Sequence, residues 1–170
     1  MQENQGTFQM PQWKEIPDLG LYMDQVVLYV QRACEGLYGE EEAKRLLTPA
    51  MVNNYVKAGL IPRPTGKKYG REQLATILMI VQLKGVLSMD MIRLMLEGDR
   101  IEALYDMFCA KQRNAMRAFD VDDPLTAATE ACIHALACER LLLARKMEKE
   151  NSVGKIETEA DNSSEGRRKK

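Results

Sequence analysis

TPAMVNNYVKAGLIPRPTGKKYGREQL, residues 48–74, holds the clearest local signals of secondary structure in this chain. Thr48 is a preferred helix N-cap, and Pro49 fits the first helical position. Gly59 is typical of the residue that follows a helix, because it tolerates a left-handed backbone. The stretch therefore predicts a short helix that begins at Thr48 and ends before Gly59.

This predicted helix has one apolar and one polar face. The apolar face should dock on neighbouring helices, and the polar face is left free to meet a ligand. An Asn amide offers a donor and an acceptor together, which suits the edge of adenine. The apolar face holds Val52, Tyr55 and Val56, and the polar face holds Ala50, Asn53, Asn54 and Lys57.

Positive charge gathers on the rest of the quoted stretch. Residues 53–74 hold five basic residues and one acidic residue, although the whole chain has a formal net charge of −1. Two prolines exclude a helix here, and Thr65-Gly66 can supply a tight turn. Residues 60–61 can then pair with residues 68–69 as a very short β-hairpin. Cations at its tip would suit phosphates, although lysines there can also guard an edge strand against aggregation.

Helices are predicted on both sides of this stretch. Leu, Met and Ala dominate the composition, which favours helix over sheet and an all-α fold. Residues 40–47 are expected to form a short helical turn or an ordered loop. Apolar spacing and turn residues predict helices over residues 24–37, 71–84, 88–98 and 101–118, and from Asp123-Pro124 to about Glu150.

Residues 48–96 resemble the DNA-binding domain of the MerR family of bacterial regulators. Residues 47–89 are more similar to an uncharacterised bacterial family with a MerR-like winged helix-turn-helix domain. Tyr55 and residues 59–62 follow the MerR pattern, and Lys67 and Tyr69 stand where its wing has Arg and Tyr. Asn53 stands where the family has a recognition-helix Arg. The resemblance covers residues 22–97 and implies a winged helix-turn-helix and a dimer formed through a later helix.

Four segments are therefore expected. Residues 1–19 form a flexible leader, residues 20–98 the MerR-like domain, and residues 99–150 a two-helix C-terminal extension. Residues 151–170 lack apolar periodicity and are expected to be disordered. The last helix is long and Ala-rich, and we expect it to form a homodimer. Its apolar stripe comprises Leu125, Cys132, Leu136, Leu143 and Met147.

Several classes of function are not expected. The chain shows no nucleophile–base pair, phosphate-binding Gly loop or paired-carboxylate site, so neither an enzyme nor a cofactor is predicted. His134 and Cys138 share a helix face, but Cys132 lies some 120° away, and two ligands are too few for zinc. Four scattered cysteines indicate reduced thiols in a cytoplasmic protein. No apolar run approaches the ~18 residues that span a bilayer, so no membrane partner is expected.

The predicted function is sequence-specific binding of double-stranded DNA in bacterial transcriptional regulation. Asn53 and Asn54 would contact bases. The alternative is a protein-interaction module whose basic face docks an acidic partner without binding DNA. The predicted phosphate contacts are Lys57, Arg63, Lys67, Lys68 and Arg71.

Overall fold

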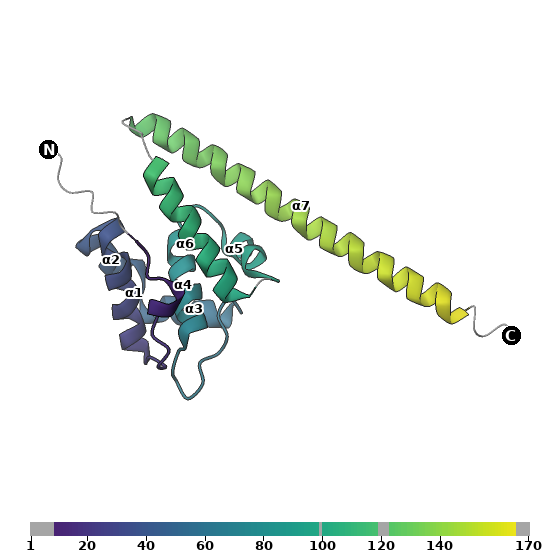
Figure 1. Ribbon diagram of the computed structural model, residues 1–170, viewed down its shortest axis with the longest axis horizontal. Helices are drawn as coiled ribbons and strands as arrows, with labels where there is room; N and C mark the ends of the chain where they lie inside the picture. The colour runs from purple at the N-terminus through teal and green to yellow at the C-terminus, as the bar shows by residue number, and fades with distance from the viewer. Residues whose placement is uncertain (1–8, 99, 119–122, 166–170) are drawn as a thin grey trace. The chain divides into compact units, whose positions relative to one another are not determined.

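The computed structural model describes residues 9–98, 100–118 and 123–165, with side chains as far as Asn151. It divides into two units, Met1–Asp122 and Asp123–Lys170. The expectation of an all-α fold is confirmed (Figure 1). The helices are η1 (Trp13–Glu15), α1 (Met23–Tyr38), α2 (Glu40–Leu46), α3 (Pro49–Lys57), α4 (Arg71–Leu83), α5 (Met89–Leu96), α6 (Ile101–Ala118) and α7 (Pro124–Glu165).

Helix α4 is the centre of the N-terminal unit. All eight consecutive residues from Leu74 to Val81 are buried, so the helix is covered on every side. A helix that is apolar all round is stable only in such a position. Its single buried polar residue, Thr76, donates its hydroxyl to the Glu72 carbonyl at 2.8 Å. Helix α4 therefore lies at the centre of this unit, where α1 and α6 pack against it.

The segment before α1 belongs to the core from Met10 onward, which differs from the flexible leader expected over residues 1–19. Met10 and Ile16 are buried. The Tyr105 hydroxyl of α6 donates to the Pro11 carbonyl at 2.7 Å, and its ring lies 6.3 Å from that of Trp13. Residues 1–8 lie outside the described part of the chain.

The β-hairpin expected between residues 60–61 and 68–69 is wrong. Tyr69 pairs instead with Leu21, through two backbone hydrogen bonds of 2.9 Å. A Cβ atom at Gly20 would lie only 2.8 Å from the Cβ of Lys68, so the two segments approach closely because residue 20 is glycine. Within the described ranges the structure has isolated bridges and no strand.

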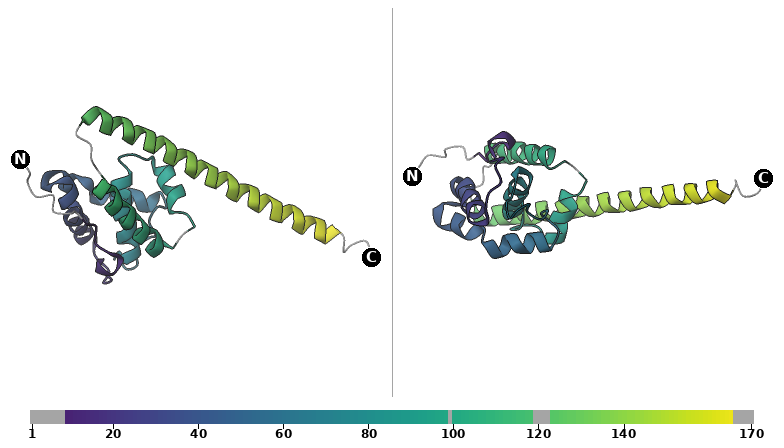
Figure 2. Two further views of the ribbon diagram at one scale, coloured as in Figure 1. Left: turned by 45° about the horizontal axis from the view of Figure 1, so that its top comes forward. Right: turned by 90° about the horizontal axis from the view of Figure 1, so that it is seen from below.

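Helix α6 packs along α4 inside the N-terminal unit, as the views in Figure 1 and Figure 2 show. Leu104, Tyr105 and Cys109 are its buried residues. The expected two-helix extension over residues 99–150 is therefore wrong for α6, because its apolar face completes the core around α4. Helix α7 alone forms the second unit.

Helix α7 is one continuous helix in every view (Figure 2). Asp123 caps it, since its carboxylate accepts from the Thr126 amide and hydroxyl at 2.8 Å. The helix continues to Glu165, beyond the end expected at Glu150. Residues 166–170 of the expected disordered tail lie outside the described residues.

Candidate nucleic-acid interface

Helix α3 has the capping that its sequence predicts. The Thr48 hydroxyl accepts from the Met51 amide at 3.3 Å, and Pro49 is the first helical residue. At the other end Gly59 has a φ of 71°, and the Leu60 amide donates to the Tyr55 carbonyl at 3.0 Å. These are the features of a Schellman C-cap, which satisfies the last carbonyls of the helix.

The apolar and polar residues of α3 lie on different faces of the helix, as the sequence predicts. Val52 and Tyr55 are buried in the core. Asn53, Asn54 and Lys57 are exposed together on the outer face of the helix. Because nine helical residues make only two and a half turns, these three side chains form one compact polar surface.

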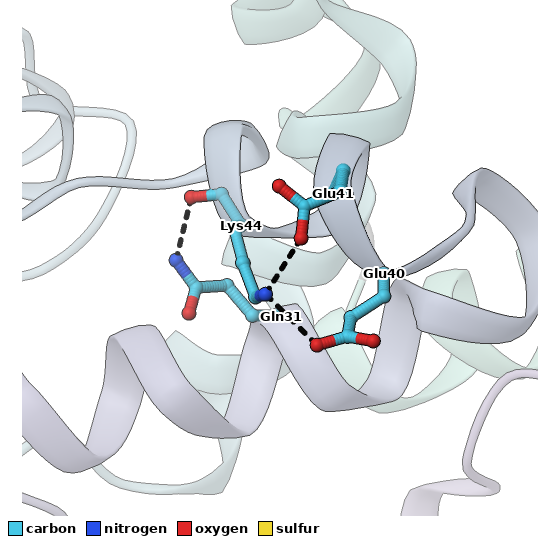
Figure 3. Close-up of polar contacts among 4 residues, drawn as sticks. All are labelled: Gln31, Glu40, Glu41 and Lys44. Atoms are coloured by element: carbon cyan, nitrogen blue, oxygen red, sulfur yellow. Dashed lines mark hydrogen bonds and ion pairs between the residues drawn. The ribbon is translucent and has the colours of Figure 1, made fainter.

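Helix α3 is positioned by side chains that hold the end of α2. The Gln31 amide donates to the Lys44 carbonyl at 2.8 Å (Figure 3). It also donates to the Leu47 carbonyl at 3.3 Å. Lys84 of α4 donates to the Leu46 carbonyl at 2.6 Å, and burial lowers the pKa of its ammonium group. Two residues, Leu47 and Thr48, then lead into α3. The α2–α3 corner is therefore fastened to both α1 and α4.

The acidic residues that begin α2 are paired within their own helix. Lys44 lies 2.8 Å from the carboxylates of both Glu40 and Glu41 (Figure 3). Hydrogen bonds to Lys44 lower the pKa of each carboxylate, and the same bonds raise the pKa of Lys44. Carboxylates in the first helical turn also meet the positive end of the helix dipole. The acidic residues at the start of α2 therefore have a local role, which is to stabilise that helix.

The loop between α3 and α4 carries a tight basic turn at residues 62–68. Gly66 and Lys67 have φ values of 57° and 66°, and the Lys68 amide donates to the Thr65 carbonyl at 3.0 Å. Two successive positive φ angles are typical of a type I′ turn. Gln73 closes the base of the loop, because its amide donates to the Pro62 carbonyl at 3.0 Å. The loop projects away from the helices at the bottom of Figure 1.

The basic turn presents three of the predicted phosphate contacts to solvent. Arg63, Lys67 and Lys68 are exposed. The Lys68 ammonium lies 5.2 Å from the centre of the Tyr22 ring, a cation–π contact that orients its side chain. No Asp or Glu occurs between residues 44 and 71, so the turn and α3 share a stretch without negative charge.

Arg71 is placed differently from the other predicted contacts. Its guanidinium donates from Nε to the Ile16 carbonyl at 2.9 Å and lies 3.7 Å from the Asp18 carboxylate. It also lies 5.9 Å from the centre of the Trp13 ring, and its side chain is 24% exposed. Arg71 therefore anchors the N-terminal segment to α4. The sequence could not show this, because its partners lie more than fifty residues away.

Residues 11–111 match a family model described as a domain of unknown function, DUF1836. The match covers more than half of the 170-residue chain. The chain belongs to the DUF1836 family. The DUF1836 region begins in the N-terminal segment, ends within α6 and leaves out α7. No curated protein and no solved structure matches the chain.

The expected membership of a MerR-like family is wrong. The chain matches DUF1836 and no MerR or winged helix-turn-helix family. The residues that carried the resemblance lie in α3 and the basic turn, where a helix cap and a glycine turn favour particular residues for local reasons. The DUF1836 region also includes residues 11–22, and the structure pairs Leu21 of that segment with Tyr69.

Sequence reasoning missed a groove at the end of α3. Val56, Leu60 and Ile61 line it together with Arg93 of α5 and Ile101 of α6. These residues lie up to 45 positions apart in the sequence, from Val56 to Ile101, and no local motif marks them. Only the packing of α5 and α6 beside α3 brings them together.

Over the described ranges, no group of three or more His, Cys, Asp or Glu side chains is placed to hold a metal ion. Cys34, Cys109, Cys132 and Cys138 are free thiols. Burial raises the pKa of Cys34 to about 11, which disfavours a reactive thiolate. None of the helices described here is both long enough and apolar enough to cross a membrane.

Proposed function

We propose that this protein binds double-stranded DNA with sequence preference, as a transcriptional regulator, through α3 and the basic turn. The observation that carries the proposal is the exposed face of α3. It holds Asn53, Asn54 and Lys57 beside a loop with three exposed cations, in a stretch without acidic residues. A basic surface of this kind attracts the phosphate backbone, and amides beside it can read base edges.

The α2–α3 corner supports this proposal. Two helices joined by a short turn can lay the second helix in the major groove while the first crosses the backbone. Base readout requires that the second helix be held rigidly. The hydrogen bonds of Gln31 and Lys84 to the end of α2 supply that rigidity.

The exposed residues divide into two roles. Asn53 and Asn54 would hydrogen-bond to base edges, with adenine the preferred partner. Lys57, Arg63, Lys67 and Lys68 would contact phosphates and contribute about equally to every sequence. If each neutralises one phosphate, they account for a salt slope of about −4 per protomer. Arg71 is left out of this set because Ile16 and Asp18 occupy its guanidinium.

We further propose that α7 joins two copies into a homodimer. A lone helix has no core of its own, and most helical stability in proteins comes from packing of an apolar face. All five residues of the apolar stripe are exposed: Cys132, Leu125 (74%), Leu136 (52%), Leu143 (44%) and Met147 (63%). A two-fold dimer would present two α3 helices to a palindromic site. A monomer mass in sedimentation equilibrium at tens of micromolar would contradict the dimer.

The experiment that tests DNA binding is selection of bound fragments from random duplexes, followed by salt titrations on the preferred site. Replacing Lys67 and Lys68 together by Gln should weaken binding equally on all sequences and reduce the salt slope by about two units. Gln is chosen because the Lys68 side chain packs against Gly20. Replacing Asn53 by Ala should weaken the free energy of binding by about 1–3 kcal/mol on the preferred site and by little on other sequences.

Lys111, exposed on α6, provides a matched control. Replacing it by Gln removes the same charge from another surface and should leave the salt slope unchanged. If the protein binds no duplex even at low salt, DNA binding is refuted. The protein-interaction alternative, in which the basic surface docks an acidic partner, would then take its place.

A further inference from the structure

The groove at the end of α3 has the size of a small-molecule site. Its volume is about 470 Å³, within the range of about 300–1,000 Å³ that is usual for ligand pockets. It lies between the last turn of α3, the first turns of α4, helix α5 and the start of α6. Leu60, Ile61, Leu96 and Ile101 supply apolar walls.

Charged groups of both signs line this groove. Arg63 comes from the basic turn, Glu72 from α4 and Glu97 from the end of α5. Among the described residues, none of these three side chains forms an ion pair or hydrogen bond. Arg93 also lines the groove, but it donates to the Asp90 carboxylate and to the Ala58 carbonyl, both at 2.9 Å. The unpaired charges are therefore one guanidinium and two carboxylates.

We propose that this groove binds a free amino acid with a large apolar side chain. Arg63 receives its carboxylate, Glu72 and Glu97 receive its ammonium group, and the apolar walls receive its side chain. Opposite charges that line one cavity without contacting each other leave room for a molecule that carries both charges. Leu60 and Ile61 are already buried, so binding removes from water mainly the exposed parts of Leu96 and Ile101.

Other classes of ligand fit this lining less well. A phosphate or another simple anion would be repelled by the two carboxylates. A purely apolar molecule would desolvate the three charged groups and return no polar contact to them. An amine without a carboxylate leaves the Arg63 guanidinium without a partner of opposite charge. The zwitterion is the class that satisfies all three groups.

The test uses three probes that share one aromatic body. L-Phenylalanine carries both charges, phenethylamine carries only the ammonium group, and 3-phenylpropionate carries only the carboxylate. Calorimetric titration of the full-length protein should give saturable binding of L-phenylalanine, at least about tenfold tighter than binding of either analogue. Arg63 is also a proposed phosphate contact, so the titrations are made without DNA and the two proposals fail separately.

Variants assign the two ends of the ligand. Arg63→Gln should reduce L-phenylalanine binding to the level of phenethylamine. Replacing Glu72 and Glu97 together by Gln should reduce it to the level of 3-phenylpropionate. Glu42→Gln, an exposed carboxylate of α2 outside the groove, should leave binding unchanged. All of these side chains lie at the surface, and unchanged circular dichroism would show that the variants are folded.

Three results would overturn the proposal. The first is that L-phenylalanine, L-leucine and L-tryptophan all fail to bind at about 10 mM, where even weak specific sites are occupied. The second is equal binding of the zwitterion and a one-charge analogue. The third is unchanged binding in the Arg63 variant and in the double Glu variant.

Discussion

Replacing Arg71 by Gln should destabilise the N-terminal unit and leave the salt dependence of DNA binding unchanged. The Arg71 guanidinium is largely enclosed by residues 13–18, with a 2.9 Å hydrogen bond to the Ile16 carbonyl. Gln is too short and lacks the charge to replace these contacts. The variant therefore releases the segment before α1 from α4.

The size of the effect follows from three contacts. A hydrogen bond from a charged donor contributes about 1.5–3 kcal/mol. The ion pair with Asp18 adds less than about 1 kcal/mol, because Asp18 is 76% exposed. The contact with the Trp13 ring adds about 0.5–1 kcal/mol. Because one guanidinium makes all three contacts, they are not additive, and we expect a total loss of about 2–3 kcal/mol.

Thermal unfolding followed by circular dichroism measures this loss. For a unit of roughly 110 residues, each kcal/mol lowers the melting temperature by about 4 °C, so the variant should melt about 10 °C lower. Asp18→Asn removes only the exposed ion pair and should lower it by no more than about 4 °C. A variant that melts like the wild type but loses about one unit of salt slope would refute the reasoning, because Arg71 would then be a phosphate contact.

Two further predictions concern stability. The Tyr29 hydroxyl is buried without a hydrogen-bond partner in the described part of the chain, so Tyr29→Phe should raise the free energy of unfolding at neutral pH by up to about 1 kcal/mol. Burial raises the pKa of Tyr29 from 10.0 to about 12. The stability that this pKa shift contributes is therefore present below pH 10 and is lost as the pH rises through 12. The urea midpoint of the wild type should therefore fall more steeply over this interval than that of Tyr29→Phe, and parallel curves would contradict this. Gly59→Ala should lower the free energy of unfolding by about 1–2 kcal/mol, because the φ of Gly59 is 71°. Gly85→Ala should leave it nearly unchanged, because the added Cβ meets no atom closer than 3.8 Å. Equal melting temperatures for the two glycine variants would show that the cap of α3 is not strained.

Local sequence signals were sufficient for both ends of α3 and for the start of α7. As the sequence predicts, α3 begins after Thr48 and ends before Gly59, with Pro49 as its first residue. Helix α7 likewise begins at Pro124, with Asp123 as its cap. These signals succeed because a helix end is satisfied by groups within a few residues of it. The same reasoning separates buried Val52 and Tyr55 from exposed Asn53 and Asn54.

Sequence reasoning failed wherever one basic residue had to be distinguished from another. Arg71 and Lys67 look alike in the sequence, but Arg71 lies against residues 13–18 and Lys67 lies exposed at a turn. The family resemblance failed for a related reason. A helix cap, two prolines and a basic turn describe local backbone chemistry, which is shared by chains of different families.

The order of the residues was enough to predict an all-α chain, the bounds of α3 and the basic character of the turn that follows it. It did not predict that Tyr69 pairs with Leu21, that α6 belongs to the core around α4, or that a groove of mixed charge lies at the end of α3. The difference lies in the range of the interactions. Caps, turns and face patterns act over one or two helical turns, whereas these three features depend on contacts between segments that only packing brings together.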